Sequence, residues 1–363
     1  MKTTKLILVG GFLGAGKTTL LWYAAQKLMR KGLKVGLITN DQAPELVDSK
    51  LLFLNDMHVL EVSGSCFCCN FNGFTKAIRE MQKEADVDVI IAEPVGSCTD
   101  LSATIMQPLK EFWNRELHIA PLSVLADPNR LDSMLNGGNA GLHPDAAYIY
   151  RKQLEESDII LINKTDLLTT EELNRLKLRT AQVFPAATIF EVSAIVGNGV
   201  EQWLDDVLSR RDAGKQIVEI DYDIYANGEA ILGWLNGTVI IKGENTDWDV
   251  FTHKFLASLS SEFNKQRHSV GHVKVILEND KKFIVGNIVG TSNAFSLRGS
   301  VGQSNSIRLT INARVEISPE KLDGIVRKTL ESLTIDKYVT DILAWKYLQP
   351  GRPQPTYRFT KVL

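Results

Sequence analysis

Within the first 210 residues, short apolar runs alternate with longer amphipathic ones, which is the pattern of strand–helix–strand units. The runs that predict strands are residues 5–9, 34–40, 59–62, 87–92, 119–126, 158–163 and 188–192. Their residues are apolar almost without interruption, as in strands buried on both faces. A helix is predicted over 18–30, and Thr169-x-x-Glu172 has the spacing of a capping box at the start of another. We therefore predict an α/β domain with a mostly parallel sheet and helices on both faces.

The pattern changes after residue 210, where residues 211–234 are polar and irregular and predict a linker. Further strands are predicted at 238–242, 273–277, 283–289 and 307–315. Between them, apolar residues recur at helical spacing, namely Val250, Phe251, Phe255, Leu259 and Phe263. We predict that this helix starts at Thr246-x-x-Asp249 and that a last helix starts at Ser318-Pro319.

These patterns divide the chain into four parts. Residues 1–210 form an α/β domain, which the sequence G-x-x-x-x-G-K-[ST] at residues 11–18 marks as P-loop NTPase-like. Residues 211–234 form the linker. Residues 235–335 form a smaller α+β domain. The last part, 336–363, contains several prolines and is predicted to be an extended tail.

Charge and segment length narrow the class of protein. The formal net charge is −2, which gives no global electrostatic basis for binding nucleic acid or an anionic membrane. No apolar run is long enough to span a bilayer. The first residues form a strand-like run without the layout of a signal peptide, so we expect a cytoplasmic protein. In a reducing compartment, four cysteines favour metal or redox chemistry over structural disulfides.

A glycine-rich loop between the first predicted strand and helix is the first candidate site. Gly11-Phe12-Leu13-Gly14-Ala15-Gly16-Lys17-Thr18 matches the pattern G-x-x-x-x-G-K-[ST]. Glycines here let backbone N–H groups close around phosphate oxygens. We expect Lys17 to reach the β and γ oxygens and act in catalysis, and the Thr18 hydroxyl to bind Mg²⁺. The predicted phosphate-binding residues are Gly11, Gly14, Ala15, Gly16, Lys17, Thr18 and Thr19.

The base of the nucleotide is predicted from Asn163-Lys164-Thr165-Asp166, which directly follows a buried strand. The Asp166 carboxylate can accept the N1–H and 2-amino donors of guanine, whereas adenine lacks this pair of donors. The Lys164 stem is placed to lie over the base, and Asn163 to brace the loop. Ser193-Ala194, after the last strand of the domain, would supply a backbone N–H near the guanine oxygen. The order of these motifs predicts GTP rather than ATP.

Acidic residues at strand ends are candidates for the metal and water chemistry of hydrolysis. Glu93 ends a predicted strand, where an acid can hold the Mg²⁺ water shell or orient the attacking water. Gly96, three residues later, could approach the γ-phosphate with its backbone N–H. Asp41 lies at the start of a predicted switch loop and is a candidate ligand of Mg²⁺ or a transition metal.

Three of the four cysteines lie in Cys66-Phe67-Cys68-Cys69. Thiolates bind soft and borderline metals, so Zn²⁺ or Co²⁺ is the predicted metal. If this segment is extended, Cys66 and Cys68 point to one side and Cys69 to the other. Cys98 is the fourth cysteine and a candidate for the same cluster. The alternatives are that Cys98 is a small buried hydrophobe and that the adjacent thiols are redox-active.

Together, these motifs resemble the CobW-like GTPases, which belong with the accessory GTPases of urease and hydrogenase maturation. The matching residues are 11–18, Cys66-Phe67-Cys68-Cys69, Glu93-x-x-Gly96 and Asn163-Lys164-Thr165-Asp166. The resemblance covers the first predicted domain, and the second is similar only in the order of its elements. After the second strand the family has Asn-Glu-Phe-Gly-Glu, whereas this chain has Asn40-Asp41-Gln42-Ala43-Pro44.

The resemblance implies a GTP-hydrolysing metallochaperone or metal insertase, whose nucleotide state controls Zn²⁺ or Co²⁺ binding at the cysteines. GTP, GDP and Mg²⁺ would be its cofactors, and its intrinsic turnover would be slow. Its partner would be a client metalloprotein or a corrinoid- or cobalamin-linked protein, and a homodimer is compatible with this function. Two other functions fit the motifs: a GTP-dependent activator of a corrinoid or redox enzyme that carries no metal, and a regulatory GTPase with a structural zinc.

Overall fold

The computed structural model describes residues 3–41, 47, 58–280, 282–290, 295–335 and 337–363. The chain divides into two compact units, each built from separated stretches of sequence. The first unit comprises Met1–Gln42, Asn55–Gly228 and Arg352–Leu363. The second comprises Ala43–Leu54 and Glu229–Gly351.

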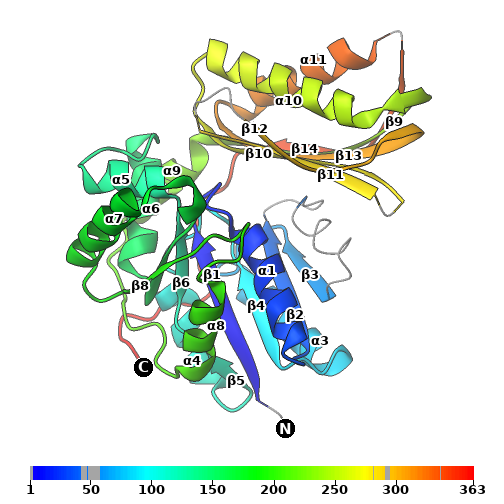
Figure 1. Ribbon diagram of the computed structural model, residues 1–363. Helices are drawn as coiled ribbons and strands as arrows, with labels where there is room; N and C mark the ends of the chain where they lie inside the picture. The colour runs from blue at the N-terminus through cyan, green and yellow to red at the C-terminus, as the bar shows by residue number, and fades with distance from the viewer. Residues whose placement is uncertain (1–2, 42–46, 48–57, 281, 291–294, 336) are drawn as a thin grey trace. The chain divides into compact units, whose positions relative to one another are not determined.

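The first unit is organised around an eight-stranded sheet in which hydrogen-bonded neighbours run parallel (Figure 1). Its strands are β1 (Thr4–Gly11), β2 (Val35–Asp41), β3 (His58–Ser63), β4 (Val89–Glu93), β5 (Leu117–Ile119), β6 (Ser123–Ala126), β7 (Ile159–Ile162) and β8 (Thr188–Glu191). Their order across the sheet is β3-β2-β4-β1-β6-β7-β8, with β5 also paired to β1. All residues of β4, β6 and β7 are buried, in agreement with their continuous apolar runs.

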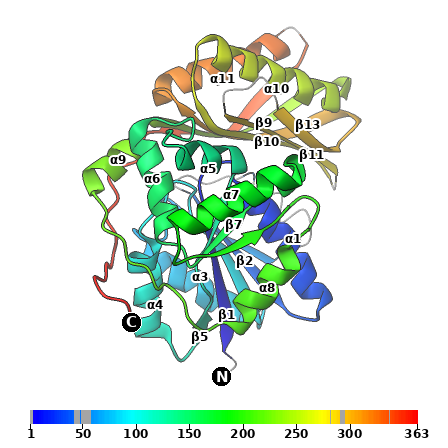
Figure 2. The same ribbon diagram turned by 60° about the vertical axis from the view of Figure 1, so that its left-hand side comes forward.

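Helices cover both faces of this sheet, as predicted. Figure 2 shows α1 (Lys17–Arg30) and α8 (Val200–Ser209) on one side of it, and α3 (Phe71–Glu84) and α4 (Gln107–Trp113) on the other. The unit also contains α5 (Pro128–Leu135), α6 (Pro144–Glu155), α7 (Thr170–Val183) and all but the last two residues of α9 (Tyr222–Ala230). A π-helical turn, Ser102–Met106, leads into α4.

The single strand predicted over 119–126 is wrong, because the structure has two strands there. β5 pairs with the start of β1 and β6 with its end. Pro121 lies between them and has no backbone N–H to donate to the sheet, so the pairing is interrupted at this point.

The second unit is a six-stranded antiparallel sheet with α10 (Trp248–Lys265) and α11 (Pro319–Thr334) on one face (Figure 1). Its strands are β9 (Leu232–Asp247), β10 (Val270–Asn279), β11 (Lys282–Gly290), β12 (Phe295–Ser300), β13 (Gln303–Glu316) and β14 (Val339–Leu348). They are ordered β12-β11-β10-β13-β9-β14. The apolar face of α10, including Phe255 and Phe263, is buried against the sheet and α11.

Several local predictions for this half of the chain are wrong. The N-cap of α10 is Asp247, whose carboxylate accepts hydrogen bonds from the backbone of Asp249 and Val250, and Thr246 belongs to β9. The Val250 side chain is exposed rather than part of the core. The segment assigned to a linker contains α9, and the segment assigned to a tail contains β14. In the part of the chain that the structure describes, no helix combines the length and apolar composition needed to cross a membrane.

Candidate nucleotide and metal site

The predicted motifs lie on loops that follow β1, β3, β4, β7 and β8. Because these strands are parallel, their carboxyl ends meet along one edge of the sheet, where ligands bind in open α/β folds. The phosphate loop follows β1, which lies between β4 and β6. The fold therefore brings together motifs that are widely separated in the sequence.

The phosphate loop is shaped by glycines whose backbone conformations disfavour larger residues. Gly11, Gly14 and Gly16 have φ angles of 130°, 79° and 98°. A Cβ atom on Gly11 would lie 2.5 Å from the carbonyl oxygen of Leu125, and one on Gly16 would lie 2.5 Å from Asn163 Nδ2. Left-handed backbone and close approach both exclude larger residues. The loop is thus preformed as a backbone cradle of the kind that binds phosphate.

Lys17 and Thr18 begin α1 and are both buried against Glu93 at the end of β4. Lys17 Nζ donates to the carbonyl oxygen of Gly11 at 2.8 Å and lies 3.7 Å from Glu93 Oε1. Thr18 Oγ1 donates to Glu93 Oε2 at 3.2 Å. A hydroxyl and a carboxylate side by side provide oxygen ligands that suit a hard cation such as Mg²⁺. Ala15 completes the loop and Thr19 lies in the first turn of α1.

The loop after β4 passes close to Lys17. A Cβ atom on Gly96 would lie 3.1 Å from Lys17 Nζ, so the backbone approaches the phosphate loop closely. Gln153 of α6 holds this loop, because its Nε2 donates to the carbonyl oxygens of Gly96 at 3.0 Å and Cys98 at 2.8 Å. Gln153 is a positioning residue that the sequence reasoning missed, and its place inside an ordinary helix gave no signal for it.

The base-recognition loop is braced by the side chain of Asn163. Its Nδ2 donates to the carbonyl oxygen of Ala15, and its Oδ1 accepts from the backbone N–H of Ala194. Asn163 therefore ties the phosphate loop to the loop after β8, which agrees with the bracing role expected for it. Lys164 has a left-handed backbone and forms an ion pair with Asp127 at 2.8 Å.

The Asp166 side chain is exposed to solvent, and its carboxylate contacts Ser193, which follows β8. Ser193 Oγ donates to Asp166 Oδ1 at 2.5 Å, and the same hydroxyl accepts from the backbone of Val196. Ser193 thereby orients the carboxylate that is expected to read guanine. The structure thus brings Asp166 to Ser193, and Ala194 to Asn163, while their contact with guanine stays a prediction.

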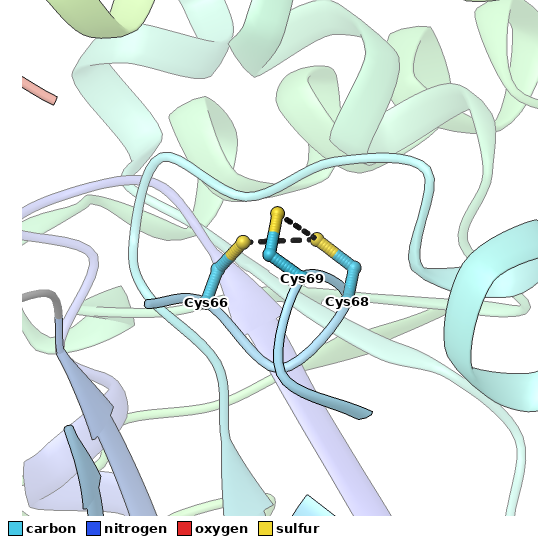
Figure 3. A group of neighbouring side chains, drawn as sticks. All are labelled: Cys66, Cys68 and Cys69. Atoms are coloured by element: carbon cyan, nitrogen blue, oxygen red, sulfur yellow. Dashed lines mark hydrogen bonds between the residues drawn. The ribbon is translucent and has the colours of Figure 1, made fainter. Parts of the chain in front are cut away.

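The three clustered thiols converge on one point (Figure 3). The Sγ atoms of Cys66, Cys68 and Cys69 all lie within 4.8 Å of one another, with 3.0 Å between Cys66 and Cys68. The expectation of opposed side chains is wrong because the segment is a turn and not extended. The backbone N–H groups of Cys69 and Asn70 both donate to the carbonyl oxygen of Cys66, which curls the chain just before α3.

Asn40 holds this cysteine turn against the end of β2. Its Nδ2 donates to the carbonyl oxygens of Val62 and Ser65, both at 2.8 Å. Its Oδ1 accepts from the backbone N–H of Phe67, also at 2.8 Å. The ring of Phe67 is buried and stacks on Phe74 of α3 at 4.1 Å between centroids. Sequence reasoning used Asn40 only as a strand end and missed this role.

Cys98 lies beside the cluster and alters its ionisation. Hydrogen bonding with Cys68, Cys69 and Cys98 lowers the pKa of Cys66 well below its usual range. The partner thiols and burial raise the pKa of Cys68, and hydrogen bonding with Cys66 raises the pKa of Cys69 to about 11. Cys66 is thus the first thiol to ionise, and a bound cation would be needed to draw the remaining protons from the others.

Among the residues that the structure describes, Cys66, Cys68 and Cys69 are the group arranged to hold a metal ion. The side chain of Asp41, predicted as a further ligand, lies outside the described part of the chain, and so does most of the segment that follows it. The candidate metal site therefore consists of three sulfur ligands on the loop after β3.

Comparison with known proteins agrees with this arrangement. Residues 5–191, just over half of the chain, match the family model described as CobW/HypB/UreG, nucleotide-binding domain. The chain belongs to the CobW/HypB/UreG family. The resemblance predicted from its motifs is thereby confirmed, and the match ends at β8, within the first unit.

Curated relatives of this family member carry names that refer to zinc. It is 26% identical over 217 residues to the zinc-regulated GTPase metalloprotein activator 1 of Dictyostelium discoideum, covering 50% of this chain and 44% of that protein. It is also 26% identical over 210 residues to the zinc chaperone CobW of Pseudomonas aeruginosa, covering 50% and 54%. The chain spans about half the length of the curated relatives it matches.

Solved structures of similar proteins are more distant. The hydrogenase maturation factor HypB from Archaeoglobus fulgidus is 18% identical, covers 56% of this chain and 88% of its own, and superposes with a TM-score of 0.39. The Zn(II)-bound YjiA GTPase from E. coli is 15% identical, covers 92% and 99%, and has a TM-score of 0.37.

Proposed function

We propose that this chain is a GTP-dependent metallochaperone that binds zinc at Cys66, Cys68 and Cys69 and delivers it to a client metalloprotein. The observation that carries the proposal is the convergence of three thiols within 4.8 Å, on the sheet edge that also holds the phosphate loop. Thiols available for metal binding fit a reducing cytoplasm, which is where we expect the protein to act.

Zinc is the preferred cargo because its tetrahedral sites accept several cysteine sulfurs. Cys98 interacts with Cys66 and Cys68, so it is the nearest candidate for a fourth ligand. Co²⁺ accepts the same donors, and corrinoid-linked clients remain part of the proposal on that basis. The zinc in the names of the relatives favours Zn²⁺ over Co²⁺.

The residues of the phosphate loop fit GTP and Mg²⁺. A Cβ atom would intrude on the cradle at Gly11 or Gly16, and Lys17 and Thr18 lie beside it with their polar ends next to Glu93. Thr18 and Glu93 would hold Mg²⁺, which neutralises phosphate charge during phosphoryl transfer. Lys17 would bind the phosphates, and Glu93 would orient the attacking water. We expect slow intrinsic GTP hydrolysis that a client accelerates.

The loop after β4 is the connection through which nucleotide and metal would communicate. Gly96 approaches Lys17 in the phosphate loop, and Cys98, two residues later, contacts the thiol cluster. Ordering of Gly96 by a γ-phosphate would therefore displace or fix Cys98, and hydrolysis would reverse the change. Because thiolates must lose protons to bind zinc, affinity should increase with pH.

A redox function is the second candidate, because Cys66 and Cys68 are only 3.0 Å apart at sulfur. In that case the chain would be a GTP-dependent activator of a corrinoid or redox enzyme and would carry no metal. A regulatory GTPase with a structural zinc is the third. These functions differ in whether metal affinity depends on the nucleotide.

Zinc affinity measured with a GTP analogue and with GDP separates the three functions. Competition against a chromogenic chelator should show different affinities in the two states, and replacing Cys66, Cys68 and Cys69 together by serine should abolish binding. Equal affinities would overturn the delivery function and leave a structural zinc. Absence of zinc binding in the reduced protein would overturn both zinc functions.

A further inference from the structure

Residues 352–363, here called the strap, return to the first unit and cross the cysteine turn. The backbone N–H of Gln354 donates to Cys69 Sγ at 3.2 Å. Thr356 makes two more hydrogen bonds to the turn. Its backbone N–H donates to the carbonyl oxygen of Cys68 at 2.8 Å, and its hydroxyl donates to the carbonyl oxygen of Cys69 at 3.2 Å. The strap therefore contacts the thiol site directly, although it is distant in sequence.

Aromatic side chains also attach the strap to α3 and α4. The Tyr357 ring lies edge-on to Phe71, the first residue of α3, with 5.3 Å between centroids. It also packs against Phe112 of α4, at 5.4 Å, and Phe359 adds a contact with Phe112 at 6.4 Å. The backbone N–H of Phe359 donates to the carbonyl oxygen of Ala103. These contacts place the strap on α3 and α4 as well as on the cysteines.

Arg358 fastens the strap to the loop that carries Gly96 and Cys98. Its Nε donates to Asp100 Oδ2 at 2.6 Å, and its Nη2 donates to Asp100 Oδ1 at 3.4 Å. Asp100 is only 1% exposed and also accepts a hydrogen bond from Tyr222 at 2.7 Å. Two charge-assisted hydrogen bonds to one carboxylate fix the orientation of the guanidinium as well as its position. Asp100 lies two residues after Cys98, so this ion pair joins the strap to the cluster.

We propose that the strap caps the thiol site, and that Arg358 is a positioning residue which keeps Cys69 in the ligand set and slows metal exchange. The proposal rests on the proposed function and adds the element that limits entry and exit of the metal. An N–H donor fixes the orientation of the Cys69 sulfur, and the strap covers the turn that bears it. Since Asp100, Cys98 and Gly96 share one loop, a nucleotide-dependent change in that loop would act on the cap and on the thiols together.

Thiol labelling of the metal-free protein tests the cap independently of metal binding. The variant is Arg358→Gln, and the matched control is Arg352→Gln, which removes another arginine of the strap that pairs with Asp223 at the surface. We expect Arg358→Gln to raise the rate at which Cys69 reacts with a disulfide reagent by about tenfold, with the control unchanged. Arg358→Lys keeps the charge and should restore most of the protection. Peptide mass spectrometry assigns the label to Cys69.

Transfer of zinc from the loaded protein to a chelator tests whether the strap slows metal exchange. We expect transfer about tenfold faster in Arg358→Gln and unchanged in Arg352→Gln. Labelling rates equal to those of the original protein in Arg358→Gln would overturn the cap. Faster labelling with unchanged zinc transfer would overturn the positioning role. If the protein bound no zinc, the proposed function would fail while the labelling result still decided the cap.

Discussion

A short stretch of residues after β4 makes contacts that the rest of the first unit depends on. Gly96 approaches Lys17, Cys98 contacts the thiol cluster, and Asp100 binds Arg358 and Tyr222. Only three residues therefore lie between Gly96, whose backbone approaches Lys17, and Asp100, which anchors the strap. Coupling between nucleotide and metal needs no long-range pathway in such an arrangement, because one loop contacts both sites.

We propose that Asp166 determines the choice of base. We expect Asp166→Ala to weaken GTP binding about 100-fold, because two charge-assisted hydrogen bonds to guanine are lost, and to leave ATP binding unchanged. Glu171→Ala is a suitable control, since it removes an equal charge five residues away. Titration with fluorescent GTP and ATP analogues measures both affinities. A parallel loss of ATP affinity would show that Asp166 maintains the loop instead of reading the base.

Glu156 should make stability depend on pH. It is fully buried and accepts hydrogen bonds from Ser102 N–H and Thr99 Oγ1, both at 2.9 Å. Burial, and then repulsion from Asp100, raise the pKa of Glu156 to about 8. An unfolded glutamate has a pKa of about 4.3, so between these values the folded state holds a proton that the unfolded state has lost. The free energy of unfolding should therefore fall as pH rises from about 5 to about 8, by at most about 1.4 kcal/mol per pH unit.

Glu156→Gln tests this pH dependence without a titrating group, because the amide oxygen can accept from Ser102 N–H while the amide NH2 donates to the Thr99 hydroxyl, which then acts as acceptor. The slope of unfolding free energy against pH between 5 and 8 should flatten, as measured by urea denaturation at several pH values. Glu155→Gln is the control, since Glu155 is paired with Arg151 and Lys152 and its pKa is lowered. A slope that persists in Glu156→Gln would assign it to other titrating groups, such as Asp100, whose pKa is raised by burial.

At the scale of elements, the cysteine turn shows how a short segment becomes a site. It lies between β3 and α3, and Asn70 caps α3 by accepting a hydrogen bond from the N–H of Gly73. The helix start and the Asn40 hydrogen bonds together fix the turn at both ends. The sulfurs converge because two backbone N–H groups share one carbonyl oxygen, and an extended strand would have separated them.

The capping box of α7 is an element whose prediction from sequence is confirmed. Thr169 Oγ1 accepts from the Glu172 N–H at 3.3 Å, and Glu172 Oε2 accepts from the Thr169 N–H at 2.8 Å. We expect Thr169→Ala to lower the free energy of unfolding by about 1 kcal/mol, whereas Thr170→Ala, at the first helical position, should have little effect. Chemical denaturation measures the difference. Equal losses in both variants would contradict a capping role.

At the scale of the whole chain, both compact units combine stretches that are far apart in sequence. In the second unit, Val47 joins β10 and β13 although it precedes them by more than two hundred residues. Its backbone N–H donates to Asn312 Oδ1 at 2.7 Å, and its side chain packs against Ile276 and Val285. A segment assigned by sequence to the nucleotide-binding domain therefore contributes to the other core.

Val47→Ala should destabilise the second unit even though the residue lies early in the chain. We expect a loss of about 1–3 kcal/mol, from lost burial and a residual cavity. Hydrogen exchange followed by mass spectrometry should show faster exchange in peptides of β10 and β11. Val250→Ala, at an exposed position of the same unit, should leave those peptides unchanged. Identical exchange in the two variants would contradict the contribution of Val47.

The sequence by itself determined the elements and chemistry that depend on local order. Continuous apolar runs specified buried parallel strands, and a glycine pattern between a strand and a helix specified the phosphate loop, because both follow from neighbouring residues. The prediction of sulfur ligands was equally local, because three cysteines within four residues are not typical of core packing.

Only the tertiary structure decided how distant groups meet. The convergence of the thiols, the hold of Asn40 and Gln153 on their loops, and the strap over Cys69 all join residues that no spacing rule relates. β14 was missed because it is an edge strand with mostly exposed side chains, so its sequence has no apolar run to reveal it. Such contacts arise from packing between separate parts of the chain, and packing is decided by the whole fold.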